Sequence, residues 1–270
     1  IAFVGSISGL GPAFSSDTLL KRVRLWFVIK VLSFIFDRKE IGVICQNTSD
    51  SEVLLSKKVL AKEKILMIPG SGVDIDEFSP SKKVINSEKY ILMSSRILFD
   101  KGIKEYCEAA MIVKATINED VKFKLSGPID SISPTSISIS ELENLAKKYG
   151  IDYLGDNRID MPVLMASASL FVLPSYYPEG VPKVLLEAAA SGVPVITTDH
   201  PGCRDAITNE RTGLLVPIKD SQALAKAIIK LITDESLSKH MGNQGRLLAE
   251  KSFQVSSVVD HHYSLYRRLL

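Results

Sequence analysis

The chain has 270 residues, and 33 Lys and Arg residues against 31 Asp and Glu residues give it a formal net charge of +2. Charged residues make up 24% of the chain and hydrophobic residues 46%, which argues against a disordered chain and against a fibrous repeat. The nearly balanced charge also argues against a protein that binds nucleic acid through its bulk charge.

The first section, residues 1–69, predicts three strands with two helices between them. Short β-branched runs alternate here with helical stretches, a pattern that is typical of a parallel sheet. The strand candidates are residues 1–4, 41–46 and 65–68, and the helix candidates are residues 18–36 and 49–60. The chain opens directly on an apolar run at Ile1. We therefore expect this section to be the carboxyl-terminal part of a domain whose first strands lie upstream.

Residues 70–80 predict a linker, because they contain Gly70, Gly72 and Pro80 and show no period of 2 or 3.6 residues. A second unit over residues 81–253 follows, with six strand candidates separated by helices. These are residues 90–94, 122–126, 152–154, 170–173, 193–197 and 213–216. Six alternating units of this kind predict a doubly wound α/β sheet.

Helix boundaries in the second unit are marked by capping residues. Ser140 and Glu143 match a capping box, and Gly150 predicts the end of that helix. Residues 221–233, 235–251 and 255–270 predict three terminal helices.

Two acids mark the segment that follows the strand candidate 170–173. Pro182 fits the first position of a short helix, and the free backbone N–H groups at the N-terminus of that helix would form an anion site. Glu187 stands on the otherwise apolar helix, where a carboxylate is costly to bury without a partner, and two sugar hydroxyls are suitable partners. Glu179 precedes the helix. The spacing alone also fits two solvated surface acids.

Two cations follow the strand candidate 90–94. Arg96 and Lys101 lie at its carboxyl end, where open α/β sheets bind ligands. Arginine can form bidentate hydrogen bonds with a phosphate, and lysine offers it a point charge. Two solvated loop cations would give the same pattern.

The cysteines and histidines do not indicate a metal site. Cys45, Cys107 and Cys203 are far apart and form no CxxC pair, and the four histidines lack zinc-ligand spacing. We expect a reduced, cytosolic setting with no metal. The apolar block at residues 25–36 has twelve residues and includes Lys30, whereas a membrane span needs about 20 apolar residues.

Together these motifs resemble glycosyltransferase family 4, the retaining, nucleotide-sugar-dependent enzymes of the GT-B fold. The resemblance covers nearly the whole chain. It rests on Arg96 and Lys101, on the spacing of Glu179 and Glu187 within PSYYPEGVPKVLLEAAASGVPVI, and on TDHPGCRDAI, TGLLVP and IPGSGVDIDEFSP. ISGLGPAFSS and CQNTSDSEVLL are similar to the branch that builds bacterial capsule, O-antigen and other surface glycans.

The resemblance implies a role for each position. Arg96 and Lys101 would hold the diphosphate of the donor, Glu187 the ribose hydroxyls, and Glu179 the transferred sugar. The other donor contacts would come from the backbone N–H groups of Gly180 and Val181 and from base-pocket loops at Gly127, Pro128, Asn157, Arg158 and Ile159. The donor would be a nucleotide-diphosphate sugar, with UDP preferred, and the acceptor a glycan or a lipid-linked sugar. No cofactor is implied.

The resemblance also implies an organisation of the chain. Residues 1–69 would belong to the acceptor domain and residues 81–253 to the donor domain, with residues 254–270 forming a helix that crosses back. Many family members carry a histidine near the position of Gly9, and this chain has none there. Two alternatives therefore stay open, a sugar-nucleotide epimerase of the same fold and a nucleotide-sugar-binding fragment without catalysis. For residues 1–270 alone, we expect nucleotide binding without transfer.

Residues 18–38 combine Lys21, Arg22, Arg24 and Lys30 with Trp26, Phe27 and many aliphatic residues. Such a helix fits an anionic membrane surface, on the inner face of the cytoplasmic membrane, where lipid-linked acceptors reside. A core helix of the first domain is the alternative, because the apolar residues surround the helix rather than forming one stripe.

Overall fold

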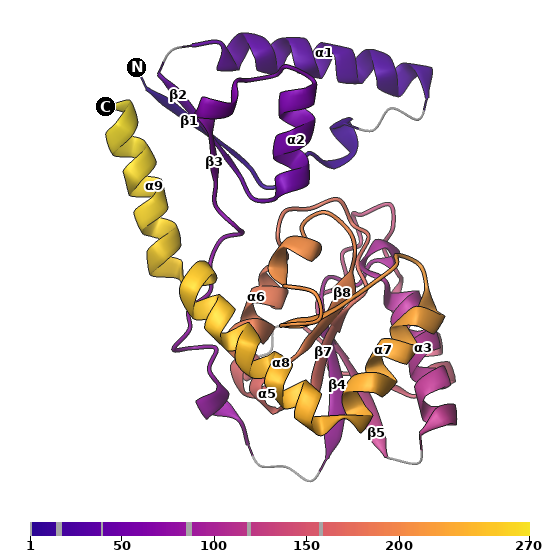
Figure 1. Cartoon of the computed structure of the whole chain (residues 1–270). Helices are drawn as coiled ribbons and strands as arrows, with labels where there is room; N and C mark the ends of the chain where they lie inside the picture. The colour runs from indigo at the N-terminus through magenta and orange to yellow at the C-terminus, as the bar shows by residue number, and fades with distance from the viewer. Residues whose placement is uncertain (1, 15–17, 39, 85–87, 118–119, 157–158) are drawn as a thin grey trace.

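The computed structural model describes residues 2–14, 18–38, 40–84, 88–117, 120–156 and 159–270. They form two α/β units, each built on a parallel sheet (Figure 1). The expected α/β class is therefore confirmed.

The first unit has a three-stranded sheet in the order β1-β2-β3. Its elements are β1 (Phe3–Ile7), α1 (Leu19–Phe36), β2 (Ile41–Cys45), α2 (Thr48–Ser56) and β3 (Ile65–Met67). The strand predicted at residues 1–4 is shifted toward the carboxyl end, because β1 pairs with β2 over its whole length, from Phe3 with Ile41 to Ile7 with Cys45. Thr18 caps α1 by accepting a hydrogen bond from the Lys21 N–H.

The second unit has the predicted six strands, in the order β6-β5-β4-β7-β8-β9, all parallel. The strands are β4 (Lys89–Ser94), β5 (Val121–Ser126), β6 (Ile151–Tyr153), β7 (Leu170–Leu173), β8 (Val195–Thr198) and β9 (Gly213–Val216). The helices are α3 (Ile103–Thr116), α4 (Ile139–Tyr149), α5 (Met161–Ser167), α6 (Lys183–Ala190), α7 (Ser221–Thr233) and α8 (Glu235–Leu248). Figure 1 shows α3 and α7 on one side of the sheet and α5 and α6 on the other. Because both faces are covered, the central strands are buried and almost entirely apolar.

One capping prediction was wrong and one was confirmed. The capping box of α4 is formed by Ser138 and Glu141 rather than by Ser140 and Glu143. Both pairs match the same four-residue pattern, and the helix begins one half-turn earlier than predicted. Gly150 ends the helix in a left-handed conformation, as expected.

The chain returns from the second unit to the first through a π-helical turn (Ala249–Phe253) and α9 (Val255–Leu269). Figure 1 shows α9 beside the strands of the first unit. Val258 and Leu265 of α9 form one apolar cluster with Ile44 and Ile68 of that unit. The linker is attached to the segment just before α9, because the Val73 N–H donates a hydrogen bond to the Phe253 carbonyl at 2.8 Å. Arg246 joins the linker to α6. It donates hydrogen bonds to the carbonyls of Ile75 and Phe78 in the linker and to the carbonyl of Ala190 at the end of α6. No helix in the described ranges is long and apolar enough to span a membrane.

Candidate functional site

The candidate site lies where the strand order of the six-stranded sheet reverses. From β4, the chain order runs to β5 and β6 on one side and to β7, β8 and β9 on the other. Loops at the carboxyl ends of the two strands that flank such a point form the usual ligand crevice of an open α/β sheet. Arg96 follows β4 and residues 174–180 follow β7, so the predicted cations and Glu179 meet at this edge.

Lys101 and Glu179 form an ion pair across this crevice, although 78 residues separate them in sequence. Lys101 is only 5% exposed, so it needs a counter-charge within reach. Gly102 presents this lysine at a left-handed turn with a φ of +81°, and a Cβ there would lie 2.3 Å from the Pro174 carbonyl oxygen. The turn that carries Lys101 is therefore pressed against the loop that carries Glu179.

Arg96 and Lys101 both lie over the ring of Tyr177. The ring centroid is 5.2 Å from Arg96 Cζ and 5.1 Å from Lys101 Nζ, so both cations are within the range of a cation–π interaction with Tyr177. Arg96 Nη1 also forms an ion pair with Asp130 Oδ2 at 2.8 Å. Hydrogen bonding to the Tyr177 side chain is the main influence that raises the pKa of Arg96. Two positive charges thus lie close to one aromatic ring at the switch point.

Glu187 is buried on α6, in the second turn of the helix. Burial raises the pKa of this carboxyl above its ordinary value, and Lys183 opposes the shift from 3.6 Å away. The contacts that join Arg96, Lys101 and Glu179 do not include Glu187, whose ion-pair partner in the described part of the chain is Lys183. A carboxylate held in this way is available to accept hydrogen bonds from a ligand.

The backbone before α6 lies against the first unit. A Cβ on Gly180 would lie 2.4 Å from the Ser8 carbonyl oxygen and 2.1 Å from Gln46 Oε1, so only glycine fits this approach. Val181 is buried. Pro182 is the N-cap in an extended conformation, and the helix begins at Lys183, so the prediction of proline at the first helical position was wrong by one residue.

The loops predicted for a base pocket lie partly next to Arg96. The Ile97 N–H donates to the Pro128 carbonyl at 2.9 Å, and the Tyr153 hydroxyl donates to the Gly127 carbonyl at 2.8 Å. Ile159 is almost fully exposed. Asn157 and Arg158 lie outside the described residues.

A second contact joins the two units beside the site. Asp205 accepts hydrogen bonds from the Thr48 hydroxyl at 3.0 Å, the Thr48 N–H at 3.3 Å and the Gly202 N–H at 3.1 Å. Half-buried His200 lies in the same region, within electrostatic range of Glu179, and burial lowers its pKa. Sequence reasoning did not single out Asp205, Tyr177 or Asp130, because their partners are distant in sequence.

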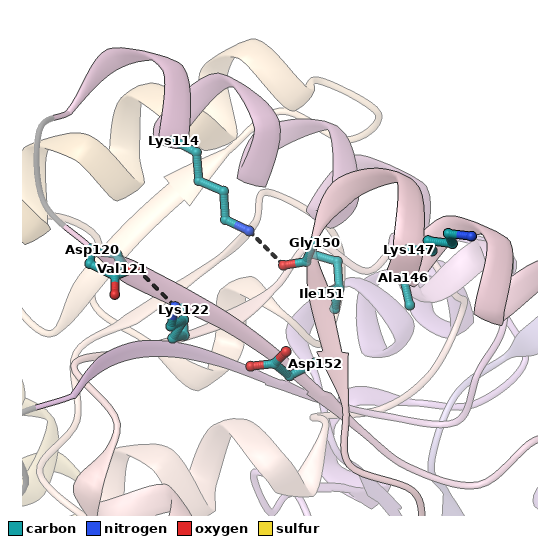
Figure 2. Close-up of a pocket in the computed structure, with 9 residues that line it drawn as sticks. All are labelled: Lys114, Asp120, Val121, Lys122, Ala146, Lys147, Gly150, Ile151 and Asp152. Atoms are coloured by element: carbon teal, nitrogen blue, oxygen red, sulfur yellow. Dashed lines mark hydrogen bonds and ion pairs between the residues drawn. The ribbon is translucent and has the colours of Figure 1, made fainter.

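A pocket of about 640 Å³ lies elsewhere, at the amino ends of β5 and β6 (Figure 2). Three of its charged side chains have partners nearby. Lys114 Nζ donates to the Gly150 carbonyl at 2.6 Å, and Lys122 pairs with Asp120 at 3.1 Å. This pocket is at the opposite end of the strands from Arg96 and is not part of the candidate site. Among the described residues, no group of three or more His, Cys, Asp or Glu side chains is arranged to hold a metal ion.

The fold and the site define an α/β protein with charged groups at the switch point of its larger sheet. Comparison with known proteins identifies the family. Residues 74–248 match the family described as "Glycosyl transferases group 1", and the chain belongs to this family of glycosyltransferases. The predicted resemblance is confirmed, as is the assignment to a family of enzymes that includes glycosyltransferases of bacterial surface-polysaccharide synthesis.

Three curated relatives make the similarity concrete. The chain is 31% identical to the N,N'-diacetylbacillosaminyl-diphospho-undecaprenol alpha-1,3-N-acetylgalactosaminyltransferase of Campylobacter jejuni, over 98% of this chain and 70% of that protein. It is 30% identical to the capsular polysaccharide biosynthesis glycosyltransferase CapM of Staphylococcus aureus, over 78% of this chain and 57% of CapM. It is 27% identical to the UDP-Gal:alpha-D-GlcNAc-diphosphoundecaprenol alpha-1,3-galactosyltransferase of Escherichia coli, over 95% of this chain and 67% of that protein. The chain thus spans between 57% and 70% of the length of these relatives.

Solved structures agree on the fold. Anabaena HepE, crystallised with UDP, superposes with a TM-score of 0.81 at 20% identity, over 99% of this chain and 72% of HepE. The sucrose-phosphate synthase of Thermosynechococcus elongatus superposes with a TM-score of 0.77 at 25% identity, over 98% of this chain and 67% of that protein. The two α/β units of this chain therefore have the GT-B arrangement.

Proposed function

We propose that this protein transfers a hexose or an N-acetylhexosamine, with retention, from a nucleotide-diphosphate sugar to a glycan or lipid-linked acceptor. The observation that carries the proposal is the pair of cations, Arg96 and Lys101, that share one tyrosine ring at the switch point of the sheet. UDP is the preferred carrier. Two of the relatives described above act on diphospho-undecaprenol acceptors by name, and one uses UDP-galactose.

In this proposal, Arg96 and Lys101 hold the diphosphate and stabilise the charge that develops on it as it leaves. Electrostatic stabilisation of this kind is commonly the largest contribution to catalysis. Glu187 accepts hydrogen bonds from the ribose hydroxyls, and Glu179 contacts the transferred sugar. Gly180 and Val181 offer backbone N–H groups near the phosphates, and the loop at Gly127–Pro128 contacts the base. Since the two cations supply the positive charge, we expect UDP binding to persist in the presence of a metal chelator.

The test is calorimetric titration of the protein with UDP and with uridine. Arg96→Ala and Lys101→Ala should each weaken UDP binding by about 1.5–3 kcal/mol, the usual value of a hydrogen bond to a charged group. Uridine, which lacks the diphosphate, should bind the variants as it binds the parent. Lys104→Ala is the matched control, because Lys104 is an exposed cation on α3 paired with Glu108. Equal losses for UDP and uridine would refute the assignment.

We also propose that α1 lies on the anionic surface of the membrane that holds the acceptor. Its side chains Trp26, Phe27 and Phe34 are all more than 60% exposed, on a helix with four basic residues. An exposed aromatic and basic helix of this kind favours a membrane interface, where each cation contributes about 1 kcal/mol.

The membrane proposal is tested by co-sedimentation with vesicles of anionic lipid. Changing Lys21, Arg22 and Arg24 together to Gln should abolish binding, and salt should release the parent protein from the vesicles. Vesicles of neutral lipid are the control. Undiminished binding of the triple variant to anionic vesicles would refute a role for these cations.

A further inference from the structure

In the proposed function, Arg96 and Lys101 together bind the diphosphate. Arg96, however, already forms an ion pair with the carboxylate of Asp130. Asp130 Oδ2 lies 2.8 Å from Arg96 Nη1, and the two side chains are 23% and 42% exposed. Asp130 comes from the loop after β5, 34 residues along the chain. The loop is fastened beside Arg96, since the Ile97 N–H donates to the Pro128 carbonyl. The carboxylate is thus held against the guanidinium by the fold itself.

Carboxylates and phosphates bind guanidinium groups through the same N–H donors. A diphosphate that reaches Arg96 therefore either displaces Asp130 or remains next to a negative charge. Both outcomes oppose binding. We propose that Asp130 is an intramolecular competitor of the nucleotide's diphosphate for Arg96, so that it weakens the hold on nucleotide diphosphates; this inference rests on the proposed function.

The position of Arg96 does not depend on Asp130 alone. The ring of Tyr177 lies 5.2 Å from Arg96 Cζ and also 5.1 Å from Lys101 Nζ, and so keeps the two cations together. When the carboxylate is neutralised, the guanidinium should stay on this ring with its N–H groups free for phosphate. This is why the loss of Asp130 charge is expected to strengthen binding, whereas loss of a positioning residue would weaken it.

The same competition applies to substrate and product. A sugar nucleotide and the UDP that remains after transfer carry the same diphosphate, so Asp130 acts against both. Its effect should be absent for uridine, which carries no phosphate. The competitor therefore favours release of the product as well as limiting the affinity for the donor.

The variant to make is Asp130→Asn. Asparagine keeps the Oδ1 acceptor that receives the Ile132 N–H at 3.3 Å, and it removes the charge that faces Arg96. Asp120→Asn is the matched control, because Asp120 also forms a surface ion pair, with Lys122, at the other end of the sheet. In calorimetric titrations, Asp130→Asn should lower the Kd for UDP by about two- to fivefold, which is the range expected for an exposed ion pair. Its Kd for uridine should stay unchanged, which also shows that the variant is folded.

Two further variants complete the experiment. Asp120→Asn should bind UDP as the parent does. In an Arg96→Ala background, Asp130→Asn should give no further gain, since the interaction it relieves is already gone.

An unchanged or raised Kd for UDP in Asp130→Asn would overturn the inference. An equal gain in Asp120→Asn would also overturn it, because the effect would then come from net charge. If the parent bound no UDP, or if Arg96→Ala caused no loss, the proposed function and this inference would fall together. If Arg96→Ala weakened UDP binding but Asp130→Asn did not strengthen it, only the inference would fall.

Discussion

Glu187→Gln should stabilise the free protein and weaken its binding of the nucleoside, two effects of opposite sign from one substitution. The carboxyl group is 8% exposed, and its ion-pair partner Lys183 lies 3.6 Å away with a mostly exposed side chain. Burial raises the pKa of Glu187 above its ordinary value of 4.5, so holding the ionised group in the folded state costs free energy. Replacing such a group with a neutral isostere should raise the free energy of unfolding by about 1 kcal/mol at pH 7.

The pH dependence follows from the direction of this shift. The pKa of Glu187 is raised in the folded state, so the folded protein favours the neutral carboxyl. The parent protein therefore has its full stability below the ordinary pKa of this group and loses part of it as the pH rises through the folded-state pKa. The difference in unfolding free energy between Glu187→Gln and the parent should therefore be present at pH 7 and disappear near pH 4. Denaturant titrations at the two pH values measure it, with Glu143→Gln, an exposed acid on α4, as the control.

Ligand binding should change in the other direction. If ionised Glu187 accepts hydrogen bonds from the ribose, Glu187→Gln should weaken UDP and uridine by similar factors, about tenfold or more. Calorimetry with both ligands checks this. A variant that is less stable than the parent at pH 7 and binds uridine with unchanged affinity would refute both parts of the reasoning.

Three further predictions concern the frame around the site. Gly102→Ala should lose more stability and more UDP affinity than Gly155→Ala, because both glycines have positive φ but only Gly102 has no room for a Cβ; thermal unfolding and calorimetry compare them. Asp205→Ala should speed hydrogen exchange at the Thr48 amide by about two- to tenfold, since that amide loses its acceptor between the two units. Arg246→Met should lower the free energy of unfolding by about 2–4 kcal/mol, because three carbonyls lose a charged donor, and denaturant titration measures this loss.

The sequence predicted the fold well because its signals are local. Apolar runs and alternating helical stretches mark all six strands of the second unit to within two residues, and the helix at residues 221–233 agrees with α7 at both ends. The α4 capping box shows the limit of such signals. Ser138 with Glu141 and Ser140 with Glu143 satisfy the same pattern, and the spacing alone does not distinguish them.

The candidate site was predicted residue by residue but not as a set of contacts. Arg96, Lys101 and Glu179 were each expected near a ligand, and the structure adds that Lys101 and Glu179 pair with each other. Asp130 and Tyr177 gave no signal in the sequence. Asp130 is 34 residues from Arg96 in the sequence, and Tyr177 follows β7, the strand that pairs with β4 on its other side. Only the assembled sheet brings both residues to Arg96.

The two ion pairs at the site differ in burial, and this difference determines which carboxylate a diphosphate displaces more easily. Lys101 is 5% exposed, so removal of Glu179 would leave a buried charge without a partner, which is costly. The Arg96–Asp130 pair is open to solvent, and exchange of its carboxylate for a phosphate costs little. A diphosphate should therefore displace Asp130 from Arg96 at a lower cost than it displaces Glu179 from Lys101. At Lys101 one anion is exchanged for another, so the buried cation need not be left uncompensated, and Glu179 is already beside the position that the transferred sugar takes.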